Sequence, residues 1–188
     1  EQKTTIDGQL KQIAEQQEYI ALTTEELTNL RTQMQTIAML RLSVLDRIKT
    51  SIEETLGDTS SVSVGDNGSI ILKEGLFFDY NSSEVKKESY ALLDKLTEAV
   101  ASFLSNEDNA QYVDTIMISG HTDNTGGAER NRALSAERAN AVLGYLLEKN
   151  GKILAPYADY FCAAGYGSTR PVGDNKTKAG QEANRRIE

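Results

Sequence analysis

Cysteine and histidine are almost absent from this sequence, which holds one residue of each, Cys162 and His121. A single cysteine builds no disulfide framework, and one cysteine with one histidine supplies neither a zinc cluster nor an evident catalytic pair. We therefore expect no metal and no cofactor. Cys162 lies in a predicted strand and is expected to be a small core residue, whereas His121 is expected to organise a loop through hydrogen bonds.

Tryptophan is missing, proline occurs twice, and no apolar run approaches the roughly 18 residues that cross a bilayer. The 188 residues have room for one ordinary domain and a short extra element, which excludes a large multidomain enzyme. The net charge of −8 argues against a surface for nucleic acid or anionic lipid. Because the chain begins at Glu1 without Met, we expect a fragment of a longer protein.

Glycine and proline divide the chain into two parts near Gly57. Up to that point there is no proline and one glycine, Gly8, whereas later glycines separate short apolar segments. This contrast predicts a helical stalk over residues 1–57 and a domain of helices and strands over residues 58–188. Gly57 is predicted to end the stalk in the left-handed cap position.

Apolar side chains recur every seven residues in the first part. They are Ile6, Ile13, Ile20, Leu27 and Met34. The companion positions are weaker, because Leu10 is apolar but Gln17, Thr24 and Arg31 are polar. A sustained seven-residue repeat is typical of a coiled coil, and a long helix with one apolar stripe needs a partner to bury it. We predict a dimeric stalk; the alternative is a solvated spacer helix that pairs weakly.

The second part alternates predicted strands and helices. Val62 and Val64, a turn at 66–68 and a strand over 69–72 predict a hairpin. The cluster Asn81-Ser82-Ser83 offers caps for a helix with apolar residues from Val85 to Leu104.

Three further segments complete this pattern. Residues 113–119 predict a strand buried on both faces, residues 131–149 a helix, and residues 160–164 another strand. The order βαβαβ predicts an α+β fold in which helices pack on a mixed sheet, preceded by the long N-terminal helix.

An arginine occupies a core position in the helix predicted over residues 131–149. Its apolar stripe is formed by Leu134, Ala141, Val142, Tyr145 and Leu146. Arg138 completes the spacing between Leu134 and Ala141, and Asn131 lies two turns before it on the same face. A partly desolvated guanidinium needs an anionic partner, and its planar fork fits a carboxylate.

Two partners for Arg138 are consistent with this pattern. One is an internal salt bridge, for which Asp123 is the obvious acid, since it lies in the loop between the buried strand and this helix. The other is a zwitterionic ligand that places its carboxylate on Arg138 and its ammonium on Asp123, because ligands bind beyond the carboxyl ends of strands in open α/β sheets. The residues alone leave both hypotheses open.

Several spaced motifs resemble one family. They are Gly120-His121-Thr122-Asp123-Asn124-Thr125-Gly126, Asn131, Leu134-Ser135, Arg138-Ala139, Gly165-Tyr166-Gly167, Arg170-Pro171, Asn175, Thr177, Gly180 and Asn184-Arg185-Arg186, with Phe78-Asp79-Tyr80-Asn81-Ser82 upstream. From about residue 60 to its end, the chain strongly resembles the OmpA-like peptidoglycan-binding domain. That family includes C-terminal domains of OmpA proteins, Pal lipoproteins and MotB-type stator subunits.

The resemblance implies non-catalytic binding of the diaminopimelate residue of the peptidoglycan stem peptide. Asp123 would engage the ammonium group and Arg138 the carboxylate. Without ligand, these two residues are expected to pair with each other. Asn131 and Asn81 would line the pocket, with Asp79 and Thr122 close by. The family often has arginine at the position of Gln181, which is a departure from the pattern.

The helical stalk resembles a MotB-type stator B subunit more than an OmpA or Pal protein. This implies a periplasmic homodimer, anchored to the inner membrane by a missing N-terminal helix, with a multi-spanning A-type subunit as partner. The motor would be flagellar or a related ion-driven system, such as one for phage defence. The alternatives are an envelope tether without a motor, a structural oligomerisation module, and a cell-wall enzyme using Asp79, Asp123 and Glu129. The enzyme is disfavoured because no nucleophile–base pair or metal set accompanies these carboxylates.

Overall fold

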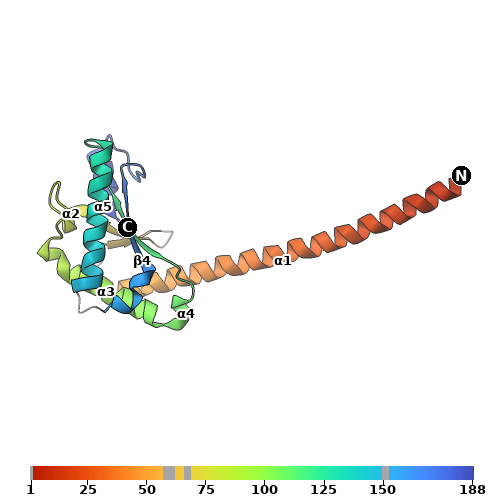
Figure 1. Cartoon of the computed structure of the whole chain (residues 1–188), viewed down its shortest axis with the longest axis horizontal. Helices are drawn as coiled ribbons and strands as arrows, with labels where there is room; N and C mark the ends of the chain where they lie inside the picture. The colour runs from red at the N-terminus through yellow and green to blue at the C-terminus, as the bar shows by residue number, and fades with distance from the viewer. Residues whose placement is uncertain (1, 57–61, 66–68, 150–152) are drawn as a thin grey trace. The chain divides into compact units, whose positions relative to one another are not determined.

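The computed structural model describes residues 2–56, 62–65, 69–149 and 153–188. Residues 2–56 form one uninterrupted helix, α1 (Gln2–Leu56), drawn red to orange in Figure 1. The predicted long helix is therefore confirmed, while the cap at Gly57 lies outside the described residues. By its internal contacts the chain divides into two units, 1–43 and 44–188. The predicted domain boundary at residue 57 stays a prediction.

Threonines do not interrupt α1, because their hydroxyl groups are satisfied within the helix. The hydroxyls of Thr24, Thr28 and Thr32 each donate to the carbonyl oxygen four residues earlier, at 2.7–2.9 Å. This intrahelical bonding is a common way for a helix to accommodate threonine. Thr24 thus occupies a stripe position without leaving a hydroxyl unpaired.

Five strands form one mixed sheet in the second unit. They are β1 (Val62–Val64), β2 (Ile70–Lys73), β3 (Ile116–His121), β4 (Phe161–Gly167) and β5 (Arg186–Ile187), in the order β1-β2-β5-β3-β4. Only β3 and β4 run parallel; the other neighbours are antiparallel. The α+β fold and the β1–β2 hairpin are confirmed, and the turn predicted at 66–68 lies outside the described residues.

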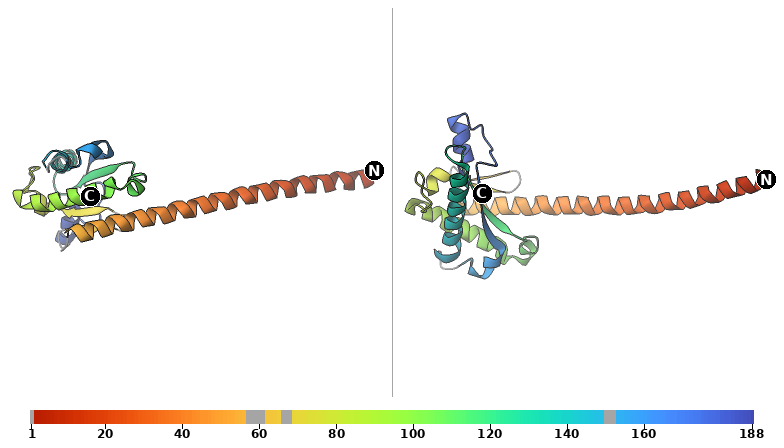
Figure 2. Two further views of the ribbon diagram at one scale, coloured as in Figure 1. Left: turned by 90° about the horizontal axis from the view of Figure 1, so that it is seen from below. Right: turned by 45° about the horizontal axis from the view of Figure 1, so that its top comes forward.

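The end of the chain is part of the sheet. Glu188 and Ser119 exchange two backbone hydrogen bonds, of 2.7 and 2.9 Å. Figure 2 marks the C-terminus within the body of helices and strands in both views. The short strand β5 therefore lies between β2 and β3 and joins the hairpin to the parallel pair.

Helices surround the sheet and supply most of the core. They are α2 (Glu74–Phe77), η1 (Lys87–Ser89), α3 (Tyr90–Ser105), α4 (Glu107–Ala110), α5 (Ala128–Gly144), the π-helical turn η2 (Tyr145–Lys149), η3 (Ala155–Tyr160) and α6 (Lys178–Asn184). Leu93, Leu96 and Leu104 of α3 join Val142 of α5 and Ile187 of β5 in one buried cluster. Their burial is the main driving force for folding of this unit.

Two glycines let α5 lie directly on β3 and β4, as Figure 1 shows for β4. A Cβ atom on Gly120 would overlap the carbonyl oxygen of Ser135, and one on Gly165 would overlap the backbone nitrogen of Ala136. Because both obstacles are main-chain atoms, only residues without a side chain fit here. This close contact fixes the middle of α5 against the ends of the strands.

Two predictions about the strands are wrong. Strand β3 begins at Ile116 rather than residue 113 and is not buried on both faces, because Met117 is 44% exposed. Cys162, opposite Met117 on β4, is exposed rather than in the core. The reason is that β4 is an edge strand, and the helices bury only the face that carries Ile118 and the two glycines.

The helix start predicted at residues 81–83 is also wrong. Helix α3 begins at Tyr90, after the short 3₁₀ turn η1. Asn81 has a φ of 57°, in the left-handed region, so the chain turns there instead of starting a helix. The Ser82 side chain accepts a hydrogen bond from the N–H of Glu84, which stabilises this turn. These residues form part of the site instead.

Candidate functional site

The buried arginine of α5 lies at the centre of the site. The side chain of Arg138 is 3% exposed and lies over the ring of Phe78, with Cζ 5.2 Å from the ring centroid. Its Nε donates to the carbonyl oxygen of Ser82 at 2.8 Å, and Nη2 donates to that of Asp79 at 3.3 Å. The turn after α2 therefore holds the guanidinium through main-chain atoms, which explains why residues 79–82 do not form a helix.

The anionic partner of Arg138 is Glu74, at the start of α2. Nη1 lies 2.8 Å from Oε1 of Glu74, and both side chains are buried. The internal salt bridge is thus present, but the expectation that Asp123 supplies its acid is wrong. Burial raises the pKa of Glu74, opposed by the positive charge of Arg138, while burial lowers the pKa of Arg138. The second carboxylate oxygen of Glu74 has no hydrogen-bond partner among the described residues.

Asp123 binds a different arginine. Its Oδ2 lies 2.5 Å from Nη1 of Arg185, and its Oδ1 accepts from the N–H of Thr125 at 2.8 Å. Burial alone raises the pKa of Asp123, but the hydrogen bonds from Thr125 and Arg185 outweigh this and hold the pKa below its usual value. Asp123 is therefore a carboxylate at neutral pH, ready to accept hydrogen bonds from a cation.

Asn131 and Thr122 shape the loop that carries Asp123. The side-chain amide of Asn131 donates to the carbonyl oxygens of Thr125, at 3.0 Å, and Asp123, at 3.3 Å. The N–H of Thr122 donates to the carbonyl oxygen of Gly167 at 3.0 Å, which joins the loop to the end of β4. The buried hydroxyl of Thr122 has no partner among the described residues. Asn131 is buried and its amide is directed into the loop, so it positions Asp123.

Asn81 and Asp79 lie at the exposed rim of the site. Oδ1 of Asn81 accepts from Nη2 of Arg130 at 3.2 Å, and Asp79 pairs with Lys86 at 2.9 Å with 80% of its side chain exposed. Asp79 therefore contacts Arg138 only through its carbonyl oxygen. The structure places Asn131 and Arg138 on α5, Thr122 and Asp123 in the loop before it, and Asp79 and Asn81 in the turn after α2. Glu74 and Arg185 complete the ion pairs, and Glu74 was missed by the sequence analysis.

His121 does not organise the loop through its side chain. Both ring nitrogens are buried and have no hydrogen-bond partner among the described residues, so the expected hydrogen bonds are not formed. The ring instead stacks on Tyr166, with centroids 5.2 Å apart, and burial lowers the pKa of His121 to about 4. Tyr166 thus packs against His121. Arg186 is buried nearby and pairs with Glu188 at 2.7 Å.

Among residues 2–56, 62–65, 69–149 and 153–188, no three Cys, His, Asp or Glu side chains lie close enough to hold a metal ion. Over the same ranges, the structure has no helix that is both long and apolar enough to cross a membrane.

The described site thus consists of buried acid–arginine pairs beside the end of a strand in a mixed sheet. The chain belongs to the OmpA family, whose model matches residues 77–185. It is 36% identical to outer membrane porin F of Pseudomonas aeruginosa over 59% of this chain and 28% of the porin. It is 31% identical to motility protein B of Bacillus subtilis over 77% of this chain and 54% of that protein. The chain thus spans about a quarter to a half of these relatives.

Solved structures give the same fold. The cell wall anchor of the type VI secretion system from Pseudomonas aeruginosa is 25% identical, with a TM-score of 0.56 over 72% of this chain and 92% of that one. A MotB-like protein from Desulfovibrio vulgaris is 20% identical, with a TM-score of 0.58 over 79% of this chain and 92% of that one. The second likeness supports the fold alone.

Proposed function

We propose that this domain binds the diaminopimelate residue of the peptidoglycan stem peptide, without catalysis, and so anchors a membrane complex to the cell wall. The observation that carries this proposal is the pair of buried charges of opposite sign, Arg138 on α5 and Asp123 in the loop before it. An ammonium on Asp123 and a carboxylate on Arg138 would use both charges at once. Membership of the OmpA family and likeness to a cell wall anchor support the same ligand.

Binding to purified sacculi tests the proposal. Arg138→Ala alone is a poor variant, because it leaves the buried Glu74 carboxylate unpaired and risks unfolding the domain. The double variant Glu74→Gln/Arg138→Gln removes both charges of that pair, and Asp123→Asn removes the other binding charge with little change in shape. We expect each to lose at least about tenfold in affinity for sacculi, as expected when a charged hydrogen bond to the ligand is lost.

The matched control is Arg132→Gln, an exposed arginine on the same helix. It changes the net charge by one unit and should bind as the wild type does. Thermal unfolding of every variant checks that the domain is folded. If the folded Asp123→Asn and Glu74→Gln/Arg138→Gln variants sediment with sacculi like the wild type, the assigned pocket is wrong.

We further propose that the complex is a MotB-like ion-driven stator unit. The match to motility protein B covers 77% of this chain, a larger share than residues 58–188 make up, so it includes part of α1. The porin match covers only 59%. On this proposal the domain is periplasmic, a segment before Glu1 spans the inner membrane, and a multi-spanning A-type subunit is the partner. Copurification of the full-length protein with such a subunit tests it; recovery of the full-length protein without one favours an envelope tether.

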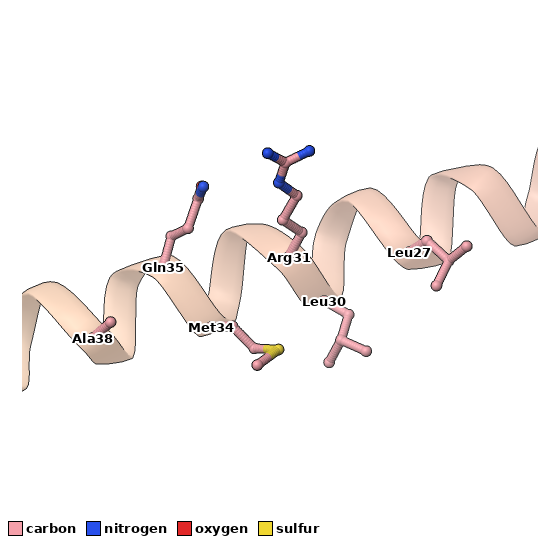
Figure 3. A pocket seen from close by; sticks show the side chains of 6 residues that line it. All are labelled: Leu27, Leu30, Arg31, Met34, Gln35 and Ala38. Atoms are coloured by element: carbon pink, nitrogen blue, oxygen red, sulfur yellow. The ribbon is translucent and has the colours of Figure 1, made fainter.

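The stalk is proposed to pair with a second copy of this chain. The stripe is open in the described part of α1: Ile6 is 54% exposed, Ile20 61% and Met34 64%. Figure 3 shows an apolar hollow on this helix, with Leu27, Leu30 and Met34 on one side and the polar ends of Arg31 and Gln35 on the other.

Spacing in this hollow fits a coiled coil. Leu27, Leu30, Arg31 and Met34 follow the spacing i, i+3, i+4, i+7, which is the four-residue hole that receives one side chain of a facing helix. The seven-residue repeat continues along the helix, so a facing helix with the same repeat would place its apolar side chains in successive holes. A second copy of this chain has that repeat. Met34→Glu should abolish dimers in sedimentation equilibrium, whereas Met39→Glu, off the stripe, should not. Dimers that survive Met34→Glu contradict the pairing.

A cell-wall enzyme is the less favoured alternative function for this domain. Asp79 is paired with Lys86 and largely exposed, and Asp123 is paired with Arg185, so neither is a free acid–base catalyst in the described structure. Incubation with sacculi followed by chromatography of the soluble fraction distinguishes the two functions. Release of any muropeptide by the wild type, but not by Asp123→Asn, contradicts the binding module.

A further inference from the structure

Four described ion pairs lie in and around the site. The pairs are Glu74–Arg138 at 2.8 Å, Asp123–Arg185 at 2.5 Å, Asp79–Lys86 at 2.9 Å and Glu137–Arg130 at 3.3 Å. Each pair contributes one positive and one negative charge. The site is therefore electrically neutral before a ligand arrives.

The carboxylates of the two inner pairs are much less exposed than those of the two outer pairs. In the inner pairs the Glu74, Arg138 and Asp123 side chains are 9%, 3% and 11% exposed. In the outer pairs the carboxylates of Asp79 and Glu137 are 80% and 47% exposed. Charges interact more strongly when they are shielded from water, and salt screens buried charges less. The balance of the inner four charges therefore dominates what the site accepts.

We propose that Glu74 and Arg185 are specificity-determining residues that hold the net charge of the site at zero and so select a ligand end carrying one ammonium and one carboxylate. This proposal rests on the proposed function, because it takes Asp123 and Arg138 as the groups that bind the two ends. Glu74 and Arg185 act through those groups and are positioning residues.

Arg138 has N–H donors that the described acceptors leave unused. A guanidinium has five N–H donors, and the described acceptors, Glu74, Asp79 and Ser82, take one each. A ligand carboxylate can therefore join Glu74 instead of replacing it, and Arg138 would then face two carboxylates. That excess negative charge is offset only if the ligand also brings a cation to Asp123. The Arg185 side chain is 39% exposed, so it can move and leave one carboxylate oxygen of Asp123 to accept a hydrogen bond from that cation.

Ligands with a single charge unbalance the site. A stem peptide with lysine brings an ammonium without the neighbouring carboxylate and leaves one excess positive charge. A peptide with 2-aminopimelate brings the carboxylate alone and leaves one excess negative charge. Burying an uncompensated charge is unfavourable, so both should bind more weakly than diaminopimelate.

Three synthetic stem tripeptides, identical except for meso-diaminopimelate, lysine or 2-aminopimelate at the third position, test this inference by calorimetry with the full chain at pH 7. Glu74→Gln makes the site positive by one unit while keeping an oxygen for Arg138. It should improve the affinity for the 2-aminopimelate peptide relative to diaminopimelate by on the order of tenfold. Arg185→Gln makes the site negative and should improve the relative affinity for the lysine peptide by a similar factor.

The double variant Glu74→Gln/Arg185→Gln restores neutrality and should restore the wild-type order of affinities. Glu98→Gln and Arg132→Gln are matched controls, because they alter the chain's net charge at exposed positions and should leave the order unchanged. If the wild type prefers diaminopimelate and neither single variant changes the ranking, the inference is overturned while the proposed function stands. If the wild type binds none of the peptides, both fail.

Discussion

Nη1 of Arg138 lies 2.8 Å from Oε1 of Glu74, and the two side chains are only 3% and 9% exposed. The arginine proposed to bind a ligand is therefore also part of an ion pair in the protein's interior. Glu74 begins α2 and Arg138 lies in α5, so this pair joins the sheet hairpin to the helix layer. Binding and folding stability consequently depend on the same guanidinium, and variants must separate the two effects.

Breaking this pair on one side should destabilise the domain strongly. Glu74→Ala leaves a buried guanidinium without its anion, and we expect a loss of about 3 kcal/mol or more in the free energy of unfolding. Glu74→Met/Arg138→Met removes both charges and should lie much closer to the wild type. Urea unfolding at pH 7 measures both. The control is Glu137→Ala, which breaks the half-exposed pair with Arg130 and should cost less than about 1 kcal/mol. Equal losses for Glu74→Ala and Glu137→Ala would contradict a buried role for the pair.

His121 should make the domain less stable in mild acid. Its pKa is lowered from 6.5 to about 4 by burial, with Arg186 and Arg170 acting in the same direction and Glu188 against it. Between these pH values the unfolded chain binds a proton at His121 that the folded chain does not bind. Stability is therefore lost as the pH falls from 6.5 towards 4, by up to about 3 kcal/mol.

His121→Phe keeps a ring against Tyr166 and removes this titration. Its stability should depend less on pH between 6.5 and 4 than that of the wild type, measured by urea unfolding at several pH values. Burial raises the pKa of Glu74, so the contribution of Glu74 to the stability of the fold increases as the pH falls. This contribution is the same in both proteins and cancels in the comparison. Parallel pH curves for the two proteins would show that His121 does not titrate in this way.

Gly120→Ala should destabilise the domain because the new methyl group would overlap α5, which cannot move away without losing its packing on the sheet. The group would overlap the main-chain carbonyl of Ser135, so helix and strand must separate, which we expect to cost about 2 kcal/mol or more. Gly144→Ala is the matched control: nothing lies within 4 Å of its new methyl group, and alanine favours a helix by about 0.5–1 kcal/mol. Thermal unfolding distinguishes them. A Gly120→Ala protein as stable as the wild type would mean that the two elements are not held in close contact.

The elements that the sequence predicted well are those with a local periodic signal. The seven-residue repeat indicated α1, the alternation around residues 62–72 indicated the hairpin, and the apolar stripe with one arginine indicated α5 and Arg138. What could not be predicted depends on contacts between distant segments. Glu74 pairs with a residue 64 positions later, and its only local signal is an acidic side chain inside the apolar segment from Ile70 to Phe78.

Which strand residues are buried also depends on contacts between distant segments and could not be predicted from the local sequence. Ile116, Met117 and Ile118 are equally apolar in sequence, yet Ile118 faces the helices and Met117 faces outward. Which face of β3 and β4 is covered depends on where α5 packs, and this follows from the two glycines that admit it. Cys162 was misplaced for this reason. Asp123 was correctly placed after a strand, but its arginine partner, Arg185, comes from the far end of the chain.

Arg31→Leu should tighten the proposed pairing of the stalk. In a parallel pair, the two Arg31 side chains would lie at equivalent positions of the seam and repel each other. Leucine removes this repulsion and extends the apolar stripe between Leu27 and Met34, so the dimer dissociation constant should fall by about tenfold or more. Lys11→Leu is the control, since it also removes a positive charge from an exposed position of α1 but lies beside the stripe rather than on it. Sedimentation equilibrium of the full chain measures both constants. A dissociation constant that Arg31→Leu leaves unchanged, or that both variants lower equally, would show that Arg31 does not lie at an interface between two copies.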